Sequence, residues 1–279
     1  HLGELWNLFQ FVNPGLLGTW TDFNNHFIRE ELTAASREKL QRMTQPFILR
    51  RTKMEVLSDL PEKNTYEHPV ELTHAEMQMY EDMRRKVEIK FKKRKTKEEK
   101  ELAKTLNIDF LAELTKLRLA ANDMRLADDS WTEESSKILA LKDIMSTLTD
   151  NPDNRIFVFS QFTSFLELIG QALRNEGIDY LYLDGQTSMK ERALLVTKFQ
   201  TGQCPVFLIS LKAGGLGLNL TAANYVIMMD PWWNPAIEQQ ASDRAHRIGQ
   251  ERIVTVIRMV AKHTIEEKIL RLHETKQDL

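Results

Sequence analysis

The sequence predicts an α/β domain with a parallel β-sheet over about residues 135–265, preceded by helical material. Short apolar runs recur there every 19–28 residues, mostly with helix-like stretches between them, which is the βαβ pattern. The runs are continuously apolar rather than alternating, as expected of strands that are covered on both faces. They read RIFVFS, YLYLD, VFLIS, YVIMMD and IVTVIRMV.

The first 60 residues contain no convincing strand and are expected to be helical. Apolar residues recur at helical spacing from Leu2 to Phe9, and Asn13-Pro14-Gly15 interrupts the pattern. A second helical stretch covers about residues 20–43. Residues 58–70, SDLPEKNTYEHPV, have the proline and polar content of a connector.

A helical hairpin is predicted next. Thr73 and Glu76 have the form of a capping box, and the long helix that follows runs into the basic cluster at residues 84–100. A returning helix is expected over about 100–120. The basic cluster suits a phosphate backbone, but it equally suits a solvated helix face or a mobile tip.

Helix-start signals support the α/β pattern of the remaining chain. Ser164 with Glu167 and Ser188 with Glu191 read as capping boxes. Asn234-Pro235 supplies an N-cap and a first helical residue. A last amphipathic helix is expected to open at Thr264 and Glu267.

Composition places limits on function. The 279 residues carry a net charge of −2, so any nucleic-acid binding must come from local patches rather than from a global basic field. The single cysteine, Cys204, excludes an internal disulfide framework. There is no apolar run of about 18 residues and no signal peptide, so no membrane partner is expected. His1 opens directly into a helical pattern, and the chain is therefore expected to be cut from a longer one.

Polar and turn-forming residues follow the predicted strands, where ligands bind in open parallel sheets. A glycine-rich turn, Gly214 to Gly217, follows VFLIS and would let the backbone approach a ligand or a neighbouring lobe closely. It is not a Walker A loop, because no glycine in the chain is followed by lysine. A magnesium role for Asp230 is disfavoured for the same reason. The polar pairs at strand ends are Ser160-Gln161, Asp184-Gly185, Ser210 with Lys212, and Asp230-Pro231.

Two further patterns could carry chemistry. Gln240, Arg244 and Arg247 recur at i, i+4 and i+7, on one face of a predicted helix, where paired arginines suit a γ-phosphate or a surface salt-bridge network with Asp243. Spacing alone does not separate these readings. Trp232 and Trp233 are expected to have one buried ring and one that offers a flat face to a base or sugar.

The string SLKAGGLGLNLTAANYVIMMDPWWNPAIEQQASDRAHRIGQ closely resembles motifs V and VI of the Swi/Snf-type DNA-dependent ATPases in helicase superfamily two. IFVFSQFTSFLELI is similar to motif IV, YLDGQTSMKER to the DNA-contacting segment after it, and HLGELWNLFQFVNPGLLG to the segment after motif III. PFILRRTKMEVLSDLPEK is similar to the inter-lobe region of the family. The resemblance spans nearly the whole chain.

The resemblance implies a RecA-like parallel sheet flanked by helices, acting as the second lobe of an ATP-driven double-stranded DNA translocase. The P-loop and most contacts to ATP and Mg²⁺ would come from a first lobe, so this chain alone would be inactive. By position, Arg244 and Arg247 resemble the arginines that reach the γ-phosphate, with Gln240, Gly215 and Gly217 in the nucleotide-linked segments. The positions implied to contact DNA are Ser160, Gln161, Gly185, Ser210, Lys212 and Trp233.

The resemblance also implies an organisation. Residues 1–70 would hold the helical end of the first lobe and a connector, 71–134 a helical protrusion, 135–263 the second lobe, and 264–279 the start of a brace helix. Residues 119–127 lack the Cys/His-containing turn of many relatives, and Lys212 stands where many have arginine, which removes bidentate geometry. The partners implied are double-stranded DNA, the first lobe and other DNA-bound proteins, with the protein itself monomeric.

Two alternatives remain open at this point: a non-catalytic nucleic-acid or protein interaction module, and an RNA helicase lobe. The second is disfavoured because Gln250 stands where RNA helicases usually have a further arginine. The wording NPGLLG favours a prokaryotic source, hence a location in the cytoplasm with the nucleoid; a eukaryotic member would be nuclear.

Overall fold

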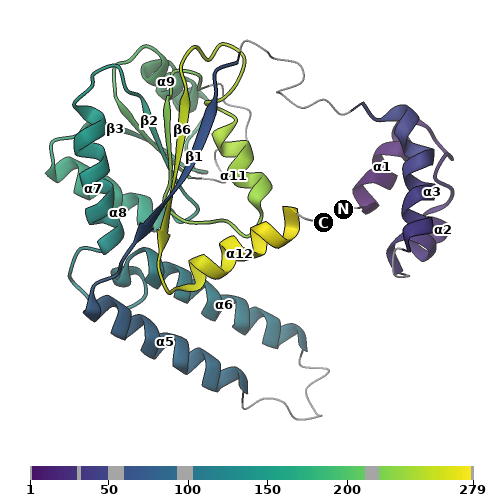
Figure 1. Ribbon diagram of the computed structural model, residues 1–279, viewed down its shortest axis with the longest axis horizontal. Coiled ribbons are helices and arrows are strands. Elements are labelled where there is room, and N and C mark those ends of the chain that lie inside the picture. Colours follow the sequence, from purple (N-terminus) through teal and green to yellow (C-terminus); the bar gives the residue numbers. More distant parts are fainter. Residues whose placement is uncertain (1, 30–32, 50–59, 93–102, 211–219, 278–279) are drawn as a thin grey trace. The chain divides into compact units, whose positions relative to one another are not determined.

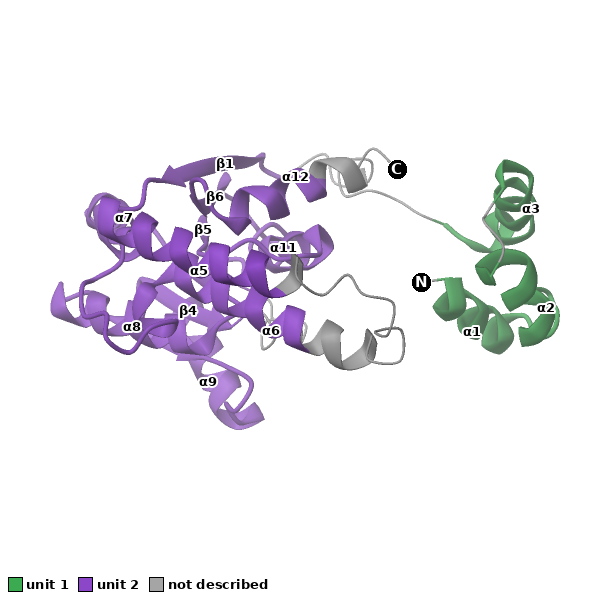
Figure 2. Cartoon of the chain, turned by 90° about the horizontal axis from the view of Figure 1, so that it is seen from below, with its two compact units in different colours: residues 1–58 green, residues 59–279 purple. Residues whose placement is uncertain are grey.

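The computed structural model describes residues 2–29, 33–49, 60–92, 103–210 and 220–277. The chain divides into two compact units, residues 1–58 and 59–279, each described by itself below (Figure 2). None of the helices in the described ranges is long and apolar enough to cross a membrane.

The first unit is helical over its described residues, as the sequence predicts. Thr19 and Thr33 cap α2 and α3 through their side-chain oxygens. A small core forms around Phe9, Phe23 and Phe27. Its elements are α1 (Leu2–Val12), α2 (Trp20–Asn24), a π-helical turn (Asn25–Arg29), α3 (Ala34–Thr44) and a 3₁₀ turn (Gln45–Phe47).

The second unit is built on a parallel sheet with strand order β1-β6-β5-β2-β4-β3 over the described residues (Figure 1). Every strand pairing in this sheet is parallel. All strands therefore end at the same edge, here called the carboxyl edge. The strands are β1 (Lys63–Val70), β2 (Ile156–Ser160), β3 (Tyr180–Leu183), β4 (Val206–Ser210), β5 (Tyr225–Met228) and β6 (Val254–Ala261).

Helices cover both faces of this sheet, which explains why the central strands are apolar throughout. The apolar side chains of α7 and α8 pack on one face, and those of α9 and α11 pack on the other. These helices are α7 (Ser136–Thr149), α8 (Thr163–Asn175), α9 (Met189–Gln200) and α11 (Pro235–Ser242). The α/β class predicted from the sequence, a parallel sheet flanked by helices, is confirmed.

A helical hairpin, α5 (His74–Lys92) and α6 (Ala103–Asn122), packs at the carboxyl edge (Figure 1). Its core includes Tyr80 and Leu117, which meet Ile265 and Ile269 of α12 (Ile265–Gln277). A 3₁₀ turn, Met124–Leu126, follows α6. The capping box before α5 is present: the Glu76 amide donates to Thr73 Oγ1 at 3.2 Å, and the Thr73 amide donates to Glu76 Oε2 at 2.8 Å.

Two local predictions are wrong. The predicted connector at 58–70 contains strand β1, which pairs along its whole length with β6. Its polar side chains fit because β1 lies at the sheet edge, where one side needs no strand partner. Ser164 is also not an N-cap, because α8 starts one residue earlier, after Phe162, and has no side-chain cap. Ser188 and Asn234 cap α9 and α11 as predicted.

Candidate functional site

The point where the sheet changes direction lies between β2 and β5. These strands are neighbours, yet the chain leaves β2 towards β3 and leaves β5 towards β6, on opposite sides. Such switch points form crevices at the carboxyl edge of open α/β sheets. Here polar contacts join the residues that follow the two strands.

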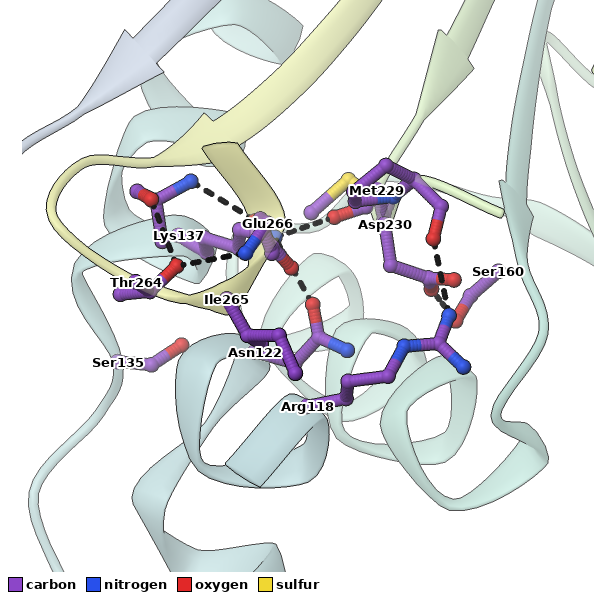
Figure 3. A network of polar contacts seen from close by, with 12 residues as sticks. Arg118, Asn122, Ser135, Lys137, Ser160, Met229, Asp230, Thr264, Ile265 and Glu266 are labelled. Atoms are coloured by element: carbon purple, nitrogen blue, oxygen red, sulfur yellow. Dashed lines mark hydrogen bonds and ion pairs between the residues drawn. The ribbon is translucent and has the colours of Figure 1, made fainter. Parts of the chain in front are cut away.

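Asp230 is the centre of these contacts. Its carboxylate accepts a hydrogen bond from the Ser160 hydroxyl (Figure 3). It also accepts one from Gln161 Nε2 at 2.6 Å. Asp230 is 2% exposed and Ser160 is fully buried. The Asp230 oxygens are therefore engaged by protein donors, and the Ser160 side chain faces the interior rather than the surface.

A buried arginine from the helical hairpin covers this junction. Arg118 of α6 donates from Nη2 to the carbonyl of Pro231 at 2.9 Å. Its guanidinium lies 5.2 Å from the ring centroid of Phe162 and 5.4 Å from that of Trp233. Burial lowers the pKa of Arg118, and the nearby charge of Asp230 opposes that shift.

A buried lysine joins the same region to α12. Lys137 of α7 is fully buried and donates from Nζ to Glu266 Oε1 at 2.7 Å, to the Met229 carbonyl at 2.7 Å and to Asn122 Oδ1 at 2.9 Å (Figure 3). An ammonium has three hydrogens to donate, and all three have acceptors here. One charge thus fastens α6, the end of β5 and α12 to α7.

The segment 229–233 is consequently held by side chains from elements around it. Besides the bonds from Lys137 and Arg118, the Trp232 amide donates to Glu238 Oε1 at 2.8 Å, and the Trp232 carbonyl contacts His273 Nε2. Both tryptophan rings are half-buried, Trp232 against the core beneath α9 and α11 and Trp233 against the core of the hairpin. The expectation that one of the two rings is buried is therefore wrong, while contact of the other ring with a base or sugar stays a prediction.

Other predicted contacts at this edge differ in exposure. Gly185 is exposed and has open space where a side chain would lie, in a turn that Asp184 stabilises by accepting from the Gln186 amide at 2.9 Å. Ser210 is 3% exposed at the end of β4. Lys212, Gly215 and Gly217 lie outside the described residues.

The predicted arginine face is not a continuous helix. α11 ends at Ser242, and Arg244 and Arg247 lie in a series of tight turns, here called the arginine turn, residues 243–250. Only Gln240 is helical, and it is exposed. The prediction of one helical face for all three is wrong because the chain must reverse to enter β6. Backbone turns such as Arg244 N to Ala241 O, 3.3 Å, replace the helical bonds.

The arginine turn lies at the opposite edge of the sheet from Asp230. Asp243 forms an ion pair at 3.5 Å with Lys63, the first residue of β1. The Arg244 carbonyl accepts from the Leu220 amide at 3.3 Å, and Leu220 precedes β5. Because these partners precede their strands, the structure separates the arginines from the predicted DNA contacts at the carboxyl edge.

Arg244 is the least compensated charge of the turn. It is 6% exposed, and its Nε atom is buried without a hydrogen-bond partner among the residues that the structure describes. Burial and the neighbouring charge of Arg247 both lower the pKa of Arg244. Arg247 itself is exposed. The alternative interpretation of the arginines, as a surface salt-bridge network, required Asp243 as their partner. Asp243 instead forms an ion pair with Lys63 and accepts a hydrogen bond from Gln239 Nε2 at 3.0 Å.

Gln250 fixes the shape of the arginine turn, a role that sequence reasoning missed. Its side-chain Nε2 lies 3.0 Å from the carbonyl of Ala245 and 3.0 and 2.8 Å from those of Thr221 and Ala223, while its Oε1 accepts from the Arg252 amide at 2.9 Å. A buried amide bonded to backbone on both sides of a turn ties the turn to the segment before β5. The signal in the sequence is Gly249, because glycine is the residue type that favours turns with a positive φ. Gly249 adopts φ 94° here, and Gln250 follows it at the end of the turn.

These features can be compared with known proteins. Residues 1–126 match the SNF2-related domain family, and residues 136–249 match the helicase conserved C-terminal domain family. An uncharacterised ATP-dependent helicase of Mycoplasma genitalium is 39% identical over 280 residues, which is 99% of this chain and 26% of that protein. The chain therefore spans about a quarter of the length of this curated relative.

Solved structures are similar over most of the chain. The SWI2/SNF2 ATPase core of Sulfolobus solfataricus, determined in complex with double-stranded DNA, is 31% identical with a TM-score of 0.64, covering 98% of this chain and 58% of that one. The C-terminal part of the Fun30 ATPase domain is 26% identical with a TM-score of 0.62, covering 76% of this chain and 90% of that one. With both family matches together extending from residue 1 to residue 249, the chain belongs to the SNF2 family of helicase-type proteins, whose RecA-like fold its parallel sheet shares.

Proposed function

We propose that this chain contributes the C-terminal lobe of an ATP-dependent double-stranded DNA translocase. The arginine turn would act on a nucleotide held mainly by a first lobe, together with Mg²⁺. The carboxyl edge would contact the DNA backbone. DNA and ATP as ligands are argued from family membership and from the residues present at each edge.

The observation that carries the nucleotide half is the state of Arg244. A buried guanidinium with an unpartnered Nε and a like charge beside it is unfavourable unless an anion approaches. A γ-phosphate oxygen is a strong acceptor that would satisfy both arginines. Arg244 and Arg247 would neutralise the charge that develops during phosphoryl transfer.

The DNA half rests on the carboxyl edge. Gln161, Gly185 and Trp233 lie at or near the ends of three strands, and Gly185 leaves its backbone open to a phosphate. We assign Ser160 an indirect part in this contact, because its hydroxyl is bonded to Asp230 and so fixes the loop that carries Gln161. By the resemblance to the family, Ser210 and Lys212 would also contact DNA, Lys212 as a point charge.

The test uses the full-length protein. Arg247→Ala should lower DNA-stimulated ATP turnover by about 10³–10⁵-fold, because it removes charge needed only in the transition state. Double-stranded DNA binding, measured by fluorescence anisotropy, should stay within about twofold, since Arg247 lies at the other edge of the sheet from the proposed contacts.

Arg174→Ala is the matched control, because Arg174 is an exposed arginine of α8 whose guanidinium lies over Tyr180, with no part in the proposed sites. Its turnover should equal that of the wild type. Retained turnover in Arg247→Ala would remove the finger assignment. A wild-type ATPase stimulated by RNA and not by double-stranded DNA would remove the translocase proposal itself.

A further inference from the structure

The guanidinium of Arg118 lies between two aromatic rings that belong to different loops of the carboxyl edge. Phe162 follows β2 and Trp233 follows β5, and the centroids of both rings are within 5.4 Å of the guanidinium carbon. Phe162 follows Ser160 closely in the sequence, and Trp233 follows Asp230 closely. Arg118 therefore contacts both loops, which the hydrogen bonds of Asp230 with Ser160 and Gln161 also join.

Arg118 itself comes from neither loop. It lies near the end of α6, one helical turn before Asn122, which accepts a hydrogen bond from Lys137, so the helical hairpin fixes the position of the guanidinium. Its hydrogen bond to the Pro231 carbonyl fastens the backbone two residues before Trp233. Arg118 is 6% exposed, and at this burial the cation–π contacts are stronger than those on a surface.

We propose that Arg118 is a positioning residue that couples the helical hairpin to DNA engagement at Gln161 and Trp233. This inference rests on the proposed DNA contacts of the carboxyl edge. Arg118 does not reach the DNA; it holds the Trp233 ring and the Phe162 loop at the separation that lets Gln161 and Trp233 meet one backbone together. A displacement of the hairpin would then change how tightly the lobe holds DNA.

The first variant is Arg118→Lys in the full-length protein. Lysine keeps the charge but lacks the planar group that fits between two rings and bonds to Pro231. The DNA concentration for half-maximal ATPase stimulation should rise about tenfold. Turnover at saturating DNA should stay within about twofold, because the arginine turn at the other edge is untouched. A purely structural role would lower turnover at saturating DNA at the same time as it raises the half-saturating DNA concentration.

Arg174→Lys is the matched control, since it makes the same change at a cation–π contact, 5.8 Å from the Tyr180 centroid, and Arg174 belongs to neither proposed site. It should leave the half-saturating DNA concentration unchanged. Arg118→Met is the second variant, because it fills the space between the rings without charge; its half-saturating concentration should rise at least as far as that of Arg118→Lys. Thermal unfolding followed by circular dichroism verifies that each variant is folded.

A double-mutant cycle with Trp233→Phe gives the decisive measurement. If Arg118 acts through the Trp233 ring, the double variant Arg118→Lys/Trp233→Phe should be little worse than the poorer single variant. Wild-type half-saturation in folded Arg118→Lys and Arg118→Met, or losses that simply multiply in the double variant, would overturn the inference. A wild-type protein whose ATPase does not respond to double-stranded DNA would instead overturn the proposed function.

Discussion

Lys137 and Arg244 are both buried cations, but the protein provides hydrogen-bond acceptors for one and not fully for the other. Lys137 has three acceptors for three hydrogens, one of them the carboxylate of Glu266. Arg244 has a buried donor without a partner in the described part of the chain, and a second arginine close by. The protein provides an acceptor for every hydrogen of the Lys137 ammonium but none for the buried Nε of Arg244 among the described residues. This difference is expected if Lys137 belongs to a structural ion pair and Arg244 binds an anion, as proposed above.

The largest effect on stability is expected at Lys137, whose ammonium has an acceptor for each of its hydrogens. Lys137→Met strands a buried carboxylate on Glu266, so the free energy of unfolding should fall by about 3–5 kcal/mol. Chemical denaturation followed by tryptophan fluorescence measures this. The double variant Lys137→Met/Glu266→Gln removes the stranded charge and should recover part of the loss. A loss below about 1 kcal/mol in the single variant would mean that Glu266, whose pKa burial raises, takes up a proton or that water enters the network.

A smaller loss is expected at Gln250. Gln250→Ala leaves backbone carbonyls of the arginine turn and of the segment before β5 without their donor, which should cost about 1–3 kcal/mol in the same measurement. Gln240→Ala is the control, because Gln240 is exposed and should change stability by less than about 0.5 kcal/mol. Equal losses in the two variants would show that Gln250 does not hold the turn.

The smallest effect on stability, and one of the opposite sign, is expected at Arg244. Arg244→Met removes an uncompensated buried charge while keeping apolar volume, so the free energy of unfolding should stay constant or rise by up to about 1 kcal/mol. ATP turnover in the full-length protein should nevertheless collapse. A clear loss of stability would show that Arg244 is already satisfied by the fold, and the contrast with Lys137 would disappear.

The parts of the fold that the sequence predicted are those with a strong periodic or apolar signal. β2 and β4 are fully buried and read as continuous apolar runs, so they were identified at once. β1 was missed because its polar residues resemble a connector, and only its pairing with β6 makes it a strand. The early end of α11 was missed because the i, i+4, i+7 spacing of Gln240, Arg244 and Arg247 continues past the last helical residue.

The candidate site was predicted in part for similar reasons. Strand ends indicated Ser160, Gln161 and Asp230, although not that they bond to one another. Lys137 has no sequence signal, since a lysine next to a helix start is ordinarily solvated. Arg118 could not be predicted from the sequence because its two ring partners are distant along the chain. Such contacts form only after the hairpin has packed on the sheet.

The position of β1 has a consequence for how the chain reaches this fold. Its strand partner β6 lies about 190 residues later, from the Lys63–Val254 register onwards. At a synthesis rate of about 5–20 residues per second, β1 must wait roughly 10–40 seconds for that partner on the ribosome. An apolar strand exposed for so long would invite aggregation. The lysine, asparagine and glutamate of β1 keep the unpaired segment soluble in water. The polar residues that make β1 resemble a connector therefore also lower the tendency of the chain to aggregate before β6 is synthesised.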